Sequence, residues 1–116
     1  MVESYRDLKV RQRAIQMTLT IDRLTTSFSK DKGFGRTSPI PRAGISVAGN
    51  IAEEYGQGSR GEDKQLLAMA GGSDLEVQTQ LFIASELGYG SPAHLKEAED
   101  LSSGISKMLN SLLAKL

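Results

Sequence analysis

Apolar residues recur along this chain at the three- and four-residue spacing of an amphipathic helix. Over the first predicted helix, residues 5–28, one set lines a single face: Val10, Ala14, Met17, Ile21, Leu24 and Phe28. A second set lies on the opposite side of the same helix: Leu8, Ile15 and Leu19. A helix that is apolar on two opposed sides buries one side in its own bundle and needs a second partner for the other. We therefore expect Leu8, Ile15 and Leu19 to form an oligomer interface.

The second predicted helix is rich in small residues. It is expected to start at Ser38, an N-cap candidate with Pro39 at the first helical position, and to end at Gly56–Gly58. Its apolar face is predicted to contain Ala43, Val47, Ile51 and Tyr55. The small residues around that face would let neighbouring helices approach closely.

The third predicted helix opens with Ser59 and, three residues later, Glu62, which is the spacing of a capping box. Two apolar lines follow along it: Leu66, Ala70, Val77, Leu81 and Ala84, then Leu67, Leu75 and Phe82. Gly71 and Gly72 lie in its middle, where glycine destabilises a helix relative to alanine. This pair predicts a close helix crossing, and Gly88 is expected to end the helix.

The fourth predicted helix has Ser91 as its N-cap and Pro92 at the first helical position. Its apolar residues keep heptad spacing in two lines: Ala98, Leu101, Ile105, Met108 and Leu112, then Leu95, Ser102, Leu109 and Leu116. The sequence shows neither sustained alternation nor a hairpin signal. We therefore predict an all-α fold, an antiparallel up-down-up-down four-helix bundle that occupies residues 1–116 as one domain.

Composition excludes several classes of protein. The 116 residues contain no cysteine and one histidine, so disulfide frameworks, zinc ribbons and iron–sulfur sites are excluded. Residues 1–7 are polar and no apolar run approaches the length of a membrane span. We expect a cytoplasmic protein without a membrane partner, a cofactor or an evident small-molecule substrate.

The formal net charge is zero, which argues against a protein that coats nucleic acid over its whole surface. That zero conceals an asymmetry between the two parts of the chain. Residues 1–42 have nine basic and four acidic side chains, whereas residues 43–116 have five basic and ten acidic ones. Binding of nucleic acid or a protein partner is therefore assigned to two basic patches, one near the start of the first helix and one in the segment after it and at the start of the second helix: Arg6, Lys9, Arg13, Lys30, Lys32, Arg36 and Arg42. The alternative is a solvated surface that pairs with the acidic part.

Polar residues on the second and third helices suggest a further site. Asn50 and Glu53 share a face, and Gln78 and Gln80 are plausible partners for them. These residues either line a channel or form a hydrogen-bond network that fixes the register between helices or subunits.

Catalytic and metal sites have little support in the sequence. A di-iron site in a four-helix bundle needs paired Glu-x-x-His motifs, and His94 has no glutamate three residues before it. The nucleophile motif Gly-x-Ser-x-Gly is absent. No metal and no enzymatic activity are expected.

Four stretches of the chain resemble a known family. Residues 5–14, YRDLKVRQRA, resemble the YRDLKVWQKA opening of the proteins encoded in intervening sequences of bacterial 23S ribosomal RNA genes. Residues 42–53, RAGISVAGNIAE, are similar to that family's RRAAVSIPSNIAEG, and Gly88-Tyr89 matches its LGY turn. Gly72-Ser73, Glu76 and residues 79–81 are similar to its GSLAELETQL.

The resemblance implies a left-handed four-helix bundle, often a homopentamer, with no established enzymatic activity. A relative of the family, the accessory variability protein of diversity-generating retroelements, is a basic pentamer that associates with a reverse transcriptase and nucleic acid. Two functions follow as hypotheses. The first is a non-enzymatic homo-oligomer, of five copies by the resemblance, with a structural or interaction role. The second is an accessory protein that binds RNA or a ribonucleoprotein through basic patches.

Overall fold

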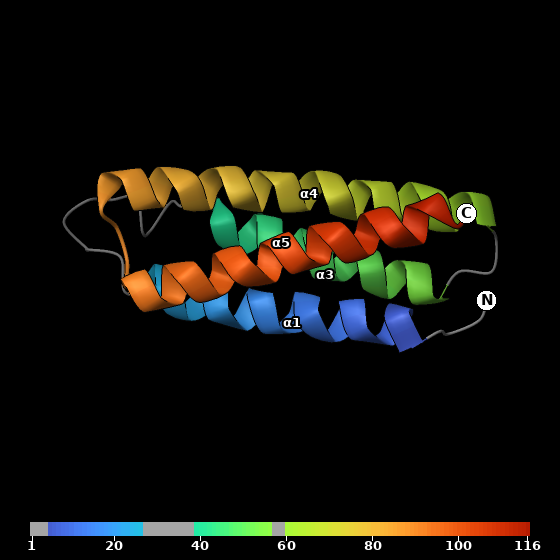
Figure 1. Ribbon diagram of the computed structural model, residues 1–116, viewed down its shortest axis with the longest axis horizontal. Coiled ribbons are helices and arrows are strands. Elements are labelled where there is room, and N and C mark those ends of the chain that lie inside the picture. Colours follow the sequence, from blue (N-terminus) through green and yellow to red (C-terminus); the bar gives the residue numbers. More distant parts are fainter. Residues whose placement is uncertain (1–4, 27–38, 57–59) are drawn as a thin grey trace.

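The computed structural model describes residues 5–26, 39–56 and 60–116, and every regular element within these ranges is an α-helix. The four helices are α1 (Tyr5–Thr26), α3 (Ile40–Gly56), α4 (Arg60–Leu87) and α5 (Pro92–Ala114). They lie side by side in a rod with extents of 47 × 21 × 18 Å (Figure 1). The predicted all-α four-helix bundle is confirmed.

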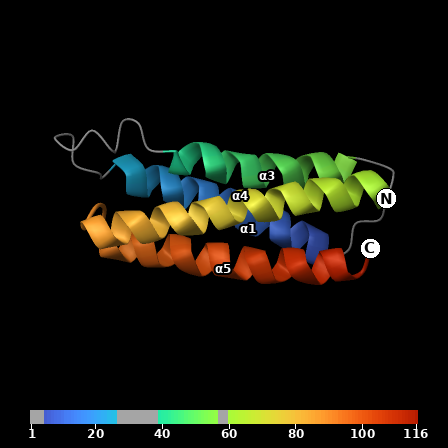
Figure 2. The same ribbon diagram turned by 90° about the horizontal axis from the view of Figure 1, so that it is seen from above.

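The chain reverses at alternate ends of the rod, so consecutive helices are antiparallel (Figures 1 and 2). α1 packs against α3 and α5, and α4 packs against the same two helices. α1 and α4 are therefore diagonal to each other across the bundle. The predicted left-handedness of the bundle stays a prediction.

One apolar stripe from each helix forms a shared core. The predicted stripe of α1 is buried from Val10 to Leu24. The other three helices add one set of buried side chains each: Ile40, Ala43, Val47 and Ile51 from α3; Leu67, Ala70, Val77, Leu81 and Ala84 from α4; Leu95, Ala98, Ile105 and Leu109 from α5. None of the described helices combines the length and the hydropathy that a membrane span requires.

The predicted helix ends agree with the structure around α5. The Ser91 side chain accepts a hydrogen bond from the His94 backbone N–H at 3.4 Å, and Pro92 is the first helical residue. Gly88 follows α4 with φ of 74°, a left-handed conformation that favours glycine.

The start of α3 is displaced from the prediction. The helix begins at Ile40, and the carbonyl of Pro39 accepts the backbone N–H of Ala43 at 3.0 Å. Pro39 therefore precedes the helix instead of opening it. The predicted caps Ser38 and Ser59 lie outside the described residues.

The close crossing predicted at Gly71 and Gly72 is wrong. A Cβ atom added at either position would meet nothing within 4 Å. The residues of α4 that contact the neighbouring helices, such as Ala70 and Val77, lie on another side of the helix. The tight approach occurs instead between α1 and α3. There, a Cβ on Gly44 would lie 3.1 Å from Ile21 Cδ1.

Candidate interaction surfaces

An apolar groove lies between the outer faces of α1 and α3. Ile15 and Leu19 of α1 and Ile45 of α3 border it, and each is more than half exposed. Leu8, one turn before Arg11, is also exposed. The three α1 residues predicted to form an interface therefore lie outside the core.

The shape of this groove follows from the small residues of α3. The groove has a volume of about 340 Å³, and Ala48, Gly49 and Ala52 line it without filling it. A Cβ on Gly49 would meet nothing within 4 Å, so the surface is open at this point. Arg11 is the charged residue that borders the groove. The result is a shallow apolar channel with a basic edge.

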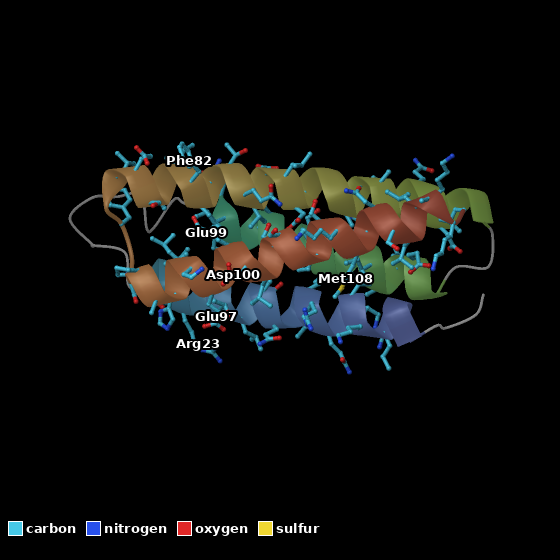
Figure 3. The ribbon with its side chains drawn as sticks, viewed as in Figure 1. Arg23, Phe82, Glu97, Glu99, Asp100 and Met108 are labelled. Atoms are coloured by element: carbon cyan, nitrogen blue, oxygen red, sulfur yellow. The ribbon has the colours of Figure 1, made fainter. Side chains whose placement is uncertain are left out.

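α4 has a second exposed apolar surface. Leu75 and Phe82, seven residues apart and so on one side of the helix, are 59% and 63% exposed. Figure 3 shows Phe82 projecting away from the bundle. Three further apolar residues of α4 are exposed, Met69, Ile83 and Leu87, and we call the five together the α4 ridge. Glu76 and Glu86 are exposed on the same helix. Leu75 and Phe82 were expected to be apolar neighbours, but the sequence did not indicate that they face solvent.

The predicted basic residues do not gather in one patch. Lys30, Lys32 and Arg36 lie outside the described residues, and the side chain of Arg6 is likewise not described. Lys9 and Arg13 lie on the side of α1 that faces α5, whereas the exposed Arg42 lies near the start of α3. Because α3 starts where α1 ends, Arg42 and Lys9 are at opposite ends of the bundle.

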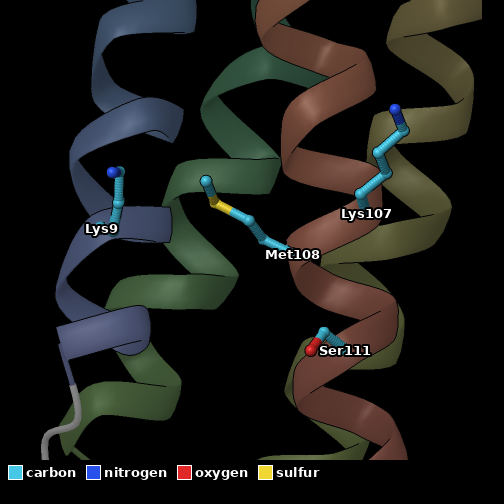
Figure 4. Close-up of a pocket in the computed structure, with 4 residues that line it drawn as sticks. All are labelled: Lys9, Lys107, Met108 and Ser111. Carbon is cyan, nitrogen blue, oxygen red and sulfur yellow. The ribbon is translucent and has the colours of Figure 1, made fainter.

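The structure brings an unpredicted lysine to the α1/α5 face. A pocket of about 290 Å³ is lined by Lys9, Lys107, Met108 and Ser111 (Figure 4). Met108 extends toward α1, while the Lys107 side chain points toward α4 and away from Lys9. Lys107 belongs to the acidic part of the sequence, and only the pairing of α1 with α5 places it beside the basic helix.

The charge of the α1/α5 face changes along its length. Beyond Arg13, which lies 3.9 Å from the Cβ position of Gly104, a depression of about 440 Å³ is bordered by Lys96, Glu97 and Asp100. The Thr20 hydroxyl donates a hydrogen bond of 2.9 Å to Glu97 and so links α1 to α5. Figure 3 shows Glu97, Asp100 and Glu99 on this part of α5. The basic stretch is therefore short.

The predicted polar network divides into two separate groups. In the first, Asn50 donates to the Ser46 carbonyl at 2.9 Å, and the hydroxyls of Ser46 and Ser73 are 2.8 Å apart, which joins α3 to α4. In the second, Gln78 donates to Asp74 at 3.4 Å. Glu53 is exposed and Gln80 half-buried, and neither takes part in these two groups.

The second group contains a buried carboxyl that sequence analysis missed. Asp74 is 1% exposed, and the Ser102 hydroxyl of α5 donates to it at 2.9 Å. Burial raises the pKa of the Asp74 carboxyl from its ordinary 3.8 to about 6, against the opposing effect of the hydrogen bonds from Ser102 and Gln78. Its spacing gave a usable signal, since Asp74 lies seven residues from both Leu67 and Leu81 on the core stripe.

In the ranges 5–26, 39–56 and 60–116, no group of three His, Asp or Glu side chains could hold a metal ion. The arrangement therefore offers two apolar surfaces, a short basic stretch and a buried polar cluster.

Comparison with known proteins adds family and fold. The family model described as 23S rRNA-intervening sequence protein matches residues 6–111. A solved structure from Bacteroides thetaiotaomicron, described as a protein with unknown function from the S23 ribosomal protein family, is similar with a TM-score of 0.83. It is 20% identical, and the match covers 94% of this chain and 98% of that one. No curated protein matches the sequence.

Proposed function

The chain belongs to the 23S rRNA-intervening sequence protein family, and from that membership we propose that it is a homo-oligomeric bundle with a structural or interaction role. Neither the family description nor that of the similar solved structure names an enzymatic activity. The proposal therefore depends on the surfaces of the bundle.

The observation that carries the proposal is the pair of exposed apolar surfaces on different helices. Contiguous exposed apolar surface is uncommon on soluble monomers unless it binds something. The α1/α3 groove is concave because Ala48, Gly49 and Ala52 line it, whereas the α4 ridge presents the large side chains Leu75 and Phe82. We assign a second copy of this chain as the partner, with the ridge of one copy in the groove of the next.

Charge supports this pairing. Arg11 borders the groove, and Glu76 and Glu86 are exposed on the helix of the ridge. Contact between the two surfaces would therefore bring opposite charges together at the rim, where complementarity favours the correct register. Arg11 belongs to the basic residues 1–42, and Glu76 and Glu86 belong to the acidic remainder of the chain.

Two different surfaces make a head-to-tail contact, which generates a ring if the rotation between copies closes. The resemblance to this family favours a ring of five copies. In a closed ring every groove binds the ridge of a neighbouring copy, so both apolar surfaces of each copy are buried.

The test is the native mass by light scattering of the wild type and of Leu8→Glu/Ile15→Glu. We expect the wild type to be an oligomer and the variant to have the 12.5 kDa mass of one chain. Ser103→Glu/Asn110→Glu is the matched control, since it adds the same charge at exposed positions of α5. A monomeric wild type would refute the assembly, and an unchanged oligomer in the groove variant would refute the groove as its interface.

The short basic stretch of the α1/α5 face supports a second candidate function, contact with nucleic acid. Lys9 and Arg13 supply up to two phosphate contacts, since the Lys107 side chain points away from Lys9 toward α4. Two contacts predict that log affinity falls by roughly 1.4–1.8 for each tenfold rise in salt. Binding of a structured RNA to wild type and Lys9→Gln/Arg13→Gln, measured from about 50 mM salt upward, tests this. Equal affinity of the two proteins, or no binding, would remove this function.

A further inference from the structure

Asp74 is an ionisable residue buried in the middle of the bundle, and the other three helices each have a long uncharged stretch. The sequence of α1 has no charged residue between Arg13 and Asp22, and that of α3 has none between Arg42 and Glu53. α5 likewise has none between Asp100 and Lys107. Ser102 lies within this uncharged stretch of α5 and is itself fully buried.

The contacts of the Asp74 carboxyl come from neutral groups. Ser102 Oγ donates to Oδ1 at 2.9 Å, and Gln78 Nε2 donates to Oδ2 at 3.4 Å. No cation pairs with Asp74 among the residues that the structure describes. An ionised carboxylate therefore has two hydrogen bonds and no compensating charge in a site removed from water, which disfavours the charged form.

Titratable groups elsewhere on the packed helices do not provide that charge. On α4 itself, Glu76 is exposed and acidic. On α5, Lys107 points toward α4 but is exposed, and no ion pair joins it to Asp74 among the described residues. Glu99, also on α5, is exposed and one turn away from Ser102 along the helix. On α1, Arg13 lies beside Gly104 in the α1/α5 face. On α3 and at the start of α4, the buried carboxyls Glu54 and Asp63 carry the same sign as Asp74 and lie toward the end of the bundle where these helices join.

We propose that Asp74 and Ser102 form a proton-controlled latch between α4 and α5. When the carboxyl is protonated, the core at this level contains only neutral groups and the two helices pack most stably. When it ionises, the same contacts hold a buried anion, and the bundle loosens between α4 and α5. The latch responds to pH between the ordinary value for aspartate and about 6.

The sign of the effect follows from linkage. Since the folded chain holds this proton more tightly than the unfolded chain, the contribution to stability is full below about pH 4 and is lost as the pH rises to about 6. Above that range Asp74 adds no further pH dependence. A pKa of Asp74 that is about two units higher in the folded chain than in the unfolded chain changes the unfolding equilibrium by up to roughly 100-fold.

The experiment compares urea unfolding of the wild type and Asp74→Asn from pH 4 to 7.5, followed by circular dichroism at one protein concentration. Asparagine keeps the size of the side chain and an oxygen that accepts from Ser102. We expect Asp74→Asn to be more stable than wild type at pH 7.5. The unfolding constant of the wild type divided by that of Asp74→Asn should fall as the pH drops through 6. The exposed Asp22→Asn control should track the wild type at every pH, since no ion pair among the described residues involves Asp22.

A second variant tests the part played by Ser102. Removal of its hydroxyl in Ser102→Ala takes away a hydrogen bond that favours the anion, so the transition should move to higher pH. A merely structural role for Ser102 would lower stability equally at every pH.

A ratio of unfolding constants between wild type and Asp74→Asn that stays constant from pH 4 to 7.5 would overturn the proposal. If Asp74→Asn does not fold, carbon NMR of the Asp74 carboxyl in the wild type gives the answer directly. Titration near 6 supports the latch, and titration near 3.8 contradicts it.

Discussion

Replacement of the two central glycines of α4 by alanine should stabilise the monomer. A Cβ at Gly71 or Gly72 meets nothing within 4 Å, so alanine introduces no clash. Each substitution removes glycine's disadvantage in a helix interior, about 1 kcal/mol relative to alanine. The double variant should therefore gain roughly 1.5–2 kcal/mol, which for a domain of this size raises the melting temperature by about 5–10 °C.

The measurement is thermal and urea unfolding by circular dichroism in the Leu8→Glu/Ile15→Glu background, so that assembly does not contribute. Gly44→Ala is the matched control because it makes the same change in a helix interior. There the new Cβ would lie 3.1 Å from Ile21 Cδ1 in the core, so the side chain of Ile21 must shift and much of the gain is lost. A double variant less stable than its parent would refute the open environment of Gly71 and Gly72.

Three other substitutions test the core, the cap and the groove. Leu81→Ala should lower the free energy of unfolding by about 2–5 kcal/mol, because Leu81 is fully buried and a cavity remains; a loss below about 1 kcal/mol in urea unfolding would contradict its place in the core. Ser91→Ala should cost about 1 kcal/mol in the same assay by removing the N-cap of α5, and an unchanged midpoint would show that this cap contributes nothing. Gly49→Ala should stabilise the monomer by up to about 1 kcal/mol but weaken assembly, since its methyl group enters the groove. Urea unfolding measures the first effect, and light scattering on dilution measures the second. Stronger assembly would contradict a groove that must stay open to bind the ridge.

The sequence predicted the helices well because each one contributes a long stripe to one core. The stripe from Val10 to Leu24 is buried as expected, and the Ser91–Pro92 start and Gly88 stop reflect local backbone chemistry that needs no tertiary information. The exposed position of Leu8, Ile15 and Leu19 also follows from spacing alone, because these residues lie on the side of the helix opposite to the buried stripe.

The predictions that failed depend on which helices meet and where. Gly71 and Gly72 look like a crossing point in sequence, but the crossing depends on the rotation of α4, and the close contact occurs at Gly44. The burial of Asp74 was likewise not predictable from its own helix, because its hydrogen-bond partner Ser102 lies on α5. Lys107 lines the same pocket as Lys9 for an equally non-local reason, the pairing of α1 with α5.

The central claim is that the groove of one copy receives the ridge of the next, and mixing two interface variants tests it most directly. Leu8→Glu/Ile15→Glu disables the groove and keeps the ridge, whereas Leu75→Glu/Phe82→Glu disables the ridge and keeps the groove. Each variant alone should be a monomer of 12.5 kDa by light scattering. Their mixture retains a single working contact, so it should form a one-to-one dimer of twice that mass and nothing larger. An assembled Leu75→Glu/Phe82→Glu variant, or a mixture that stays monomeric, would contradict the account.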